Sequence, residues 1–223
     1  MGSLNALALI TLFLFIGIYW PTFSITTYER HYTAHNTAQL IDVPQGELIA
    51  VTHRLMGYMA GRYDDLLIYA NVAGEYRQFF NQREIDHMAD VRDLFLIGFT
   101  IRNVAILIFI ATAIYAFVIN KSAKKVLAKC YFAASFSVLA MVGLLLLLIF
   151  SDFHRYFIIF HEIFFFNDYW QLNPATSLLI NMVPLVFFTN IFTVAMAIFL
   201  ACTLVMCVVS GTLLFRNRTR NNH

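Results

Sequence analysis

Two histidine-bearing segments hold the side chains best suited to chemistry. In the first, Glu84 and Asp90 each lie three residues from His87, which is one turn away in a helix. A carboxylate at this spacing can orient an imidazole and raise its basicity, and histidine is the usual general base near neutral pH. The alternative is that these residues are solvated charges on a helical surface, and the spacing alone leaves both open.

The second segment combines polar and aromatic residues in an unusual mixture. It contains His161, Glu162, Asp168 and Trp170, with four phenylalanines between residues 160 and 166. The aromatic residues are either a belt at a membrane interface or the enclosure of a site that receives the ester region of a lipid. His161 favours the second interpretation, because an imidazole among so many phenylalanines needs a polar partner.

The composition indicates what kind of element positions these residues. Of the 223 residues, 60% are hydrophobic and 13% are charged, against about a quarter charged in soluble domains. This excludes a disordered chain, a nucleic-acid-binding protein and an ordinary cytosolic enzyme. The three cysteines form no CxxC pair, so redox chemistry is not indicated. We expect an all-α integral membrane protein.

Four stretches are long and apolar enough to cross about 30 Å of hydrocarbon as helices. They are residues 4–23, 94–119, 126–150 and 185–215, and we expect them to form a single membrane domain over residues 1–223. The second contains Arg102, which either faces the interior of the bundle or extends to the lipid headgroups.

The distribution of charge predicts the orientation in the membrane. The loop 120–125 holds Lys121, Lys124 and Lys125, and the C-terminal tail holds further arginines. Residues 24–93 carry six Arg against ten acidic residues, a net charge of −4, and residues 151–182 carry one Arg against three, a net charge of −2. Because basic loops stay in the cytoplasm, we expect both termini inside and the segments 24–93 and 151–182 outside.

The two outer segments are expected to form an extracytoplasmic cap of amphipathic helices and loops. Pro44 is placed to open a helix, with Asp42 as its cap and an end near Gly61. Residues 66–80 are ambiguous, with a possible hairpin turning at Ala73 and Gly74, and a helical pattern resumes at Asn81. In the second segment, Asn173 and Pro174 predict the start of a short helix that continues to Val183.

The two histidine motifs, taken together, resemble those of a known family. Residues 84–91 (Glu-Ile-Asp-His-Met-Ala-Asp-Val) resemble one signature of the bacterial lipoprotein intramolecular transacylases, the Lit family. The stretch from Phe160 to Pro174, followed by residues 179–180, Pro184 and residues 187–188, resembles the other. Four spans with a large first outer segment also agree with this family.

The resemblance implies a reaction and a location. Members act on diacylglyceryl lipoproteins of the bacterial cytoplasmic membrane and move the sn-2 acyl chain to the α-amine of the N-terminal cysteine, giving a lyso-form lipoprotein. The two essential histidines of the family correspond to His87 and His161. We expect His87 to be the base, oriented by Glu84 or Asp90, and His161 the acid or oxyanion partner, with the roles exchangeable. No metal or other cofactor is required, and the expected partners are the lipoprotein and membrane lipids.

Supporting roles are expected for Glu162, Asp168 and Trp170, which lie within the second motif, and for Arg102 in the second span. Two other functions stay open on the residues alone. A four-helix membrane protein can bind haem between two histidines, although such ligands generally lie within the spans. A non-catalytic membrane subunit or chaperone would use the outer segments as a docking surface, and would tolerate replacement of both histidines.

Overall fold

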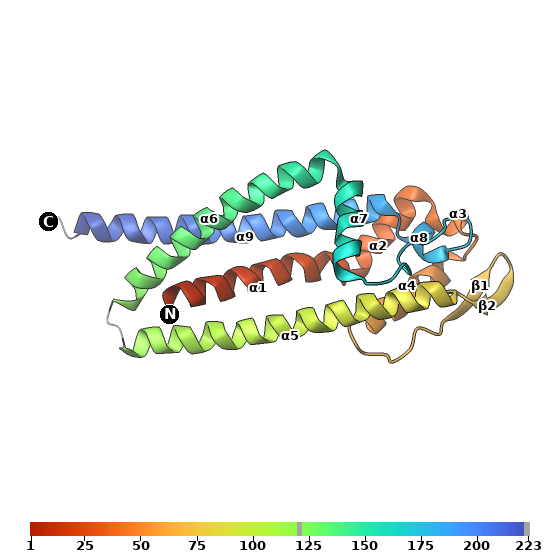
Figure 1. Cartoon of the computed structure of the whole chain (residues 1–223), viewed down its shortest axis with the longest axis horizontal. Coiled ribbons are helices and arrows are strands. Elements are labelled where there is room, and N and C mark those ends of the chain that lie inside the picture. The colour runs from red at the N-terminus through yellow and green to blue at the C-terminus, as the bar shows by residue number, and fades with distance from the viewer. Residues whose placement is uncertain (120–121, 221–223) are drawn as a thin grey trace. The chain divides into compact units, whose positions relative to one another are not determined.

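A computed structural model describes residues 1–119 and 122–220. Its elements, labelled in Figure 1, are mainly helical. In chain order they are α1 (Gly2–Thr22), α2 (Ile25–His35), α3 (Thr37–Leu40), α4 (Gln45–Met59), β1 (Tyr69–Val72), β2 (Glu75–Gln78), α5 (Gln82–Ile119), α6 (Ala123–Ser151), α7 (Phe153–Phe164), α8 (Leu178–Met182) and α9 (Leu185–Arg220). Lys121, one of the residues from which the orientation was predicted, lies outside the described residues.

Within the described residues, four helices are long and apolar enough to cross a membrane: α1, α5, α6 and α9. Each contains one of the four predicted spans or nearly all of it, so the expected all-α membrane class is confirmed. The points at which each helix enters the bilayer stay predictions. In α5 the first twelve residues up to Asp93 are rich in charge, so we place them outside the span that begins near Leu94.

The chain divides into two compact units. The first comprises Met1–Tyr19, Thr100–Asp152 and Thr193–His223, which are almost entirely parts of the four long helices. Its polar centre is Asn5, which is fully buried. The Asn5 amide donates to Thr112 Oγ1 and to the Phe109 carbonyl, each at 2.8 Å, and its oxygen accepts from the Tyr131 hydroxyl. These bonds join α1, α5 and α6.

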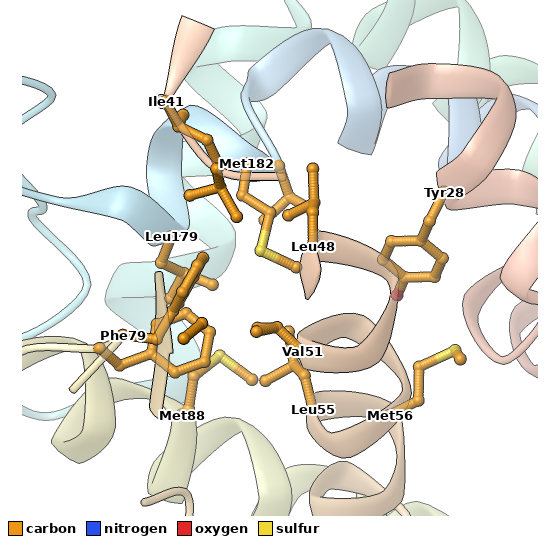
Figure 2. Close-up of a cluster of buried hydrophobic side chains, with 14 of the residues drawn as sticks. Tyr28, Ile41, Leu48, Val51, Leu55, Met56, Phe79, Met88, Leu179 and Met182 are labelled. Carbon is orange, nitrogen blue, oxygen red and sulfur yellow. The ribbon is translucent and has the colours of Figure 1, made fainter. Parts of the chain in front are cut away.

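The second unit comprises Trp20–Phe99 and Phe153–Phe192. It holds the short helices, both strands and the adjoining ends of three long helices. Its core forms around α4, where Leu48, Val51 and Leu55 recur on one face and are at most 3% exposed. Figure 2 shows these side chains pointing toward residues of β2–α5 and α8, including Phe79 and Met182. A fully buried side chain of this kind contributes about 1.5–3 kcal/mol, so α4 is firmly held in this unit.

The predicted hairpin is present. β1 pairs with β2 in antiparallel register, from Val72 opposite Glu75 to Tyr69 opposite Gln78. Ala73 and Gly74 form the turn with φ of 53° and 81°, and two consecutive positive φ values are the mark of a type I′ turn. A two-stranded hairpin is marginal alone, and α4 supports it because Glu47 accepts hydrogen bonds from the backbone and side chain of Asn71.

One predicted cap and one predicted helix start are wrong, although the helix expected to open at Pro44 does begin there, at Gln45. Asp42 does not cap α4; it has a left-handed φ of 51°, and Pro44 itself occupies the N-cap position. The last short helix starts not at Pro174 but at Leu178, because the Asn173 side chain accepts from the Ala175 N–H and closes a turn instead. The Ser177 hydroxyl then caps α8 by accepting from Ile180 N.

Candidate active site

His87 lies near the N-terminus of α5, which a reciprocal cap holds in place. The Asn81 side chain accepts from the Glu84 N–H at 3.0 Å, and the Glu84 carboxylate accepts from the Asn81 N–H at 2.7 Å. This capping box fixes the first turn of the helix. His87, one turn further, is 8% exposed, and its Nδ1 is buried with no hydrogen-bond partner among the described residues.

His161 lies in the last turn of α7, and its ring orientation is set by the backbone. Nδ1 is 2.7 Å from the carbonyl oxygen of Phe157, one turn earlier. A carbonyl can only accept, so the neutral imidazole carries its proton on Nδ1 and leaves the lone pair on Nε2. The ring is 7% exposed and stacks at a tilt against Phe157, with the ring centroids 4.3 Å apart.

The two imidazoles meet within the second unit. Their ring centroids are 5.9 Å apart with 35° between the planes. Phe165 contacts both, at 5.3 Å from His87 and 5.4 Å from His161, and Trp170 covers His161 at 5.0 Å. Two histidines separated by more than seventy residues in the sequence thus share one aromatic enclosure.

Burial keeps both imidazoles neutral. The pKa of His87 falls to about 4, chiefly because burial penalises the charged ring and further because His161 is near; Asp90 partly opposes this. Burial also lowers the pKa of His161, against the raising effect of the Phe157 carbonyl. At neutral pH each ring therefore offers one N–H donor and one lone pair, which suits proton transfer between them and a bound group.

The segment after His161 is fastened to α5 on both sides of His87. Arg83 pairs with the Asp168 carboxylate at 3.0 Å and also donates to the Asp168 carbonyl. Asn167 donates to the Asp90 carboxylate at 2.8 Å. Residues 83, 87 and 90 follow one face of α5, so the helix presents three successive contacts to this segment.

The chain is similar to known proteins in sequence and in fold. The model of the family described as "Lipoprotein intramolecular transacylase Lit" matches residues 3–188. The chain belongs to the Lit family. No curated protein matches the chain.

The solved structures of Lit from Bacillus cereus, described as membrane integral, have the same fold. One has 17% sequence identity and a TM-score of 0.76, with 98% of this chain and 96% of that chain covered. A form with a histidine-to-arginine mutation has 19% identity and a TM-score of 0.74, covering 98% and 92%. The chain is thus a multi-pass membrane protein of a transacylase family, and neither the haem-binding nor the non-catalytic alternative is favoured.

Glu84 does not have the role that the sequence predicted. Its oxygens accept hydrogen bonds from the Ser177 hydroxyl at 2.6 Å, from Leu179 N at 2.7 Å and from Asn81 N. The carboxylate is therefore turned toward α8 and away from the imidazole, because a buried charge takes the strongest donors within reach. In this Lit-family chain Glu84 joins α5 to α8, and orientation of His87 by Glu84 is wrong.

Of the remaining predicted residues, some act on the two histidines and others lie away from them. Asp90 acts on His87 through its charge, and Trp170 contacts His161 directly. Asp168 belongs to the segment that Arg83 holds, whereas Glu162 is exposed on α7. Arg102 belongs to the other unit, where its guanidinium donates to the side chain of Asn103.

Sequence reasoning missed Arg83, Asn167, Phe165 and Ser177. The helical spacing could have identified Arg83, because it precedes His87 by one turn and lies on the same helical face as His87 and Asp90. Asn167 and Ser177 carry no local pattern that indicates their partners, since these lie more than seventy residues away.

A further buried histidine lies in the second unit. His31 is 6% exposed, stacks on His35 with the centroids 4.3 Å apart, and meets the edge of Phe187 at 5.1 Å. Burial, and then proximity to His35, lowers its pKa to about 4. Neither ring nitrogen has a hydrogen-bond partner among the described residues. The neutral His31 ring therefore lowers the stability of the fold by the desolvation cost of its buried nitrogens.

Proposed function

We propose that this chain moves the sn-2 acyl group of a diacylglyceryl lipoprotein to the α-amine of the N-terminal cysteine that bears the lipid. One observation carries the proposal: His87 and His161, from two different helices, converge as buried imidazoles in a chain of the Lit family. The product is a lyso-form lipoprotein.

The reaction needs one net proton movement. The amine nitrogen forms a bond to the sn-2 carbonyl carbon, and the bond from that carbon to the glyceryl oxygen breaks. One proton leaves the nitrogen and one arrives on the oxygen, so no proton is gained or lost overall. Donor and acceptor belong to one molecule, and the enzyme has to hold them in reacting geometry and carry the proton between them.

The structure supports His161 as the base. Its Nδ1–H is engaged by the Phe157 carbonyl, which leaves the Nε2 lone pair to accept the proton of the attacking amine. His87 is then the partner that donates a hydrogen bond to the developing oxyanion or a proton to the leaving oxygen. This exchanges the roles first assigned from the sequence, where the exchange had been left open.

Neighbouring residues tune and position the pair. Asp90 favours the protonated form of His87 and so stabilises that ring when charge develops during the reaction. The pairs Arg83–Asp168 and Asn167–Asp90 hold the segment that carries Phe165 and Trp170 over the two rings. Water is thereby kept from an ester that hydrolysis would otherwise consume.

We also propose that this site works at the outer face of the bacterial cytoplasmic membrane. Support comes from the charges, since the segments 24–93 and 151–182 that contain both histidines are net acidic and the loop 120–125 is basic. Diacylglyceryl lipoproteins carry their lipid in this leaflet, which brings the ester to the level of the histidines.

Conversion of diacyl to lyso lipoprotein by single histidine variants tests the proposal. We expect His87→Asn and His161→Asn each to lower turnover by at least about 100-fold, the usual loss when an acid or base is removed. His154→Asn is the matched control, because His154 is an exposed residue of the same helix as His161. Mass spectrometry of the lipopeptide measures the product, and normal turnover by either of the first two variants excludes the two-histidine mechanism.

A further inference from the structure

One side of α7 is apolar yet exposed. Phe160, Ile163 and Phe164 are 41%, 61% and 49% exposed, and Phe166 just beyond the helix is 98% exposed. Residues 160, 163 and 164 are spaced by three and four, so they share one helical face. We call these four residues the α7 apolar face. A cluster of exposed aromatic and aliphatic side chains of this kind marks an interaction surface.

The other sides of α7 have different characters. His161 and Phe157 point into the unit, where they pack against the rings described above. Arg155 and Glu162 are exposed and spaced by seven residues, which puts them on one face, at roughly 150° from the centre of the α7 apolar face. A helix with a charged face and an exposed apolar face is typical of segments that lie in the plane of a membrane surface.

α7 packs on the start of a helix that is apolar enough to span a membrane. Phe157 packs on Phe188 with the ring centroids 5.2 Å apart, and Phe153 packs on Phe192 at 5.5 Å. Phe188 and Phe192 belong to the first turns of α9, one of the four helices apolar enough to span a bilayer. Since α7 rests on the first turns of such a helix, its free apolar side continues the lipid-facing surface.

We propose that the α7 apolar face binds the acyl chains of the surrounding bilayer and holds α7 in the interface of the leaflet next to the histidine site. Lipid is favoured over a protein partner because the face continues from the apolar surface of a spanning helix. The Phe160 ring lies 5.5 Å from His161 and is itself partly exposed, so one side chain separates the imidazole from lipid. The proposal concerns where α7 lies and holds whether or not the acyl transfer is correct.

Fluorescence quenching in vesicles tests this placement. Single cysteines replace Ile163 or Phe166 in a background where Cys130, Cys202 and Cys207 are changed to alanine, and a bimane label is attached. Glu162→Cys is the matched control from the charged face of the same helix. The labelled proteins are reconstituted in phosphatidylcholine vesicles that contain lipids with a nitroxide near the top of the acyl chain, or are exposed to aqueous iodide.

We expect lipid nitroxides to quench the labels at 163 and 166 at least threefold more strongly than the label at 162, and iodide to show the reverse order. Labels at 163 and 166 that behave like the label at 162 overturn the proposal. Weak quenching by both reagents, together with a crosslink between Ile163→Cys subunits, assigns the face to a second copy of the chain and also overturns it. None of these readings depends on enzymatic turnover, so failure here is distinguishable from failure of the proposed reaction.

Discussion

Replacing Glu84 by glutamine isolates the structural role of a carboxylate that the sequence had assigned to His87. Glu84 is 1% exposed and accepts from three donors: the Ser177 hydroxyl, Leu179 N and Asn81 N. Glutamine has one accepting oxygen and one donating amide group. If the oxygen keeps the Ser177 and Leu179 bonds, the amide group faces the Asn81 N–H and two donors meet.

These contacts determine how much stability the glutamine variant loses. A buried N–H without a partner costs about 1–3 kcal/mol, and hydrogen bonds to a charged group contribute about 1 kcal/mol more than neutral ones. Glu84→Gln should therefore lower the free energy of unfolding by about 3 kcal/mol, or roughly 6–12 °C in Tm for a chain of this size.

Thermal unfolding of the detergent-solubilised protein, followed by near-ultraviolet circular dichroism, measures this change. Glu162→Gln is the matched control, because Glu162 is an exposed glutamate and its change should shift stability by less than about 0.5 kcal/mol. Ser177→Ala should lower the free energy of unfolding by about 1 kcal/mol, less than Glu84→Gln does, because it removes only one of the three donors. If Glu84→Gln unfolds at the same temperature as Glu162→Gln, the assignment of Glu84 as the link between α5 and α8 is refuted.

Two further predictions concern a buried imidazole and a buried amide. The folded chain keeps His31 neutral down to about pH 4, whereas the unfolded chain protonates it below about pH 6.5. Protonation therefore favours the unfolded chain as the pH falls. The free energy of unfolding should decrease by about 2 kcal/mol between pH 7 and pH 5. His31→Phe should flatten the dependence of Tm on pH in that range, and an unchanged slope contradicts the neutral assignment. In the first unit, Asn5→Leu should cost about 1–2 kcal/mol by removing interhelical hydrogen bonds, and Tyr131→Phe should add little in its presence; strictly additive losses in a double-mutant cycle contradict the Asn5–Tyr131 bond.

Local patterns predicted the long helices and the hairpin, because each depends on neighbours in the sequence. An uninterrupted apolar run needs only its own backbone hydrogen bonds to become a spanning helix, and Ala73–Gly74 supplies the positive φ values of a tight turn. The short helix α8 was misplaced because its start depends on Ser177, whose hydroxyl is held by Glu84 from a distant segment.

The two histidines were predicted as a pair by resemblance of motifs, and neither spacing nor composition gives their separation. His87 and His161 meet because Phe165 packs between their helices and because Arg83 and Asn167 connect α5 to the segment after α7. Such contacts form between side chains that no helical period relates. A carboxylate one turn from a histidine was a reasonable orienting group, yet stronger donors on α8 engage it.

The core around α4 also bears on how the protein is made. Leu48 and Phe79 leave the ribosome before the second span, whereas Leu179, Met182 and Phe187, which belong to the same core, follow the third. During synthesis the first half of this core therefore lacks its partner residues until two more membrane helices have been made. A product truncated before Leu179 would therefore carry His87 and His161 without the part of this core that α8 and α9 supply.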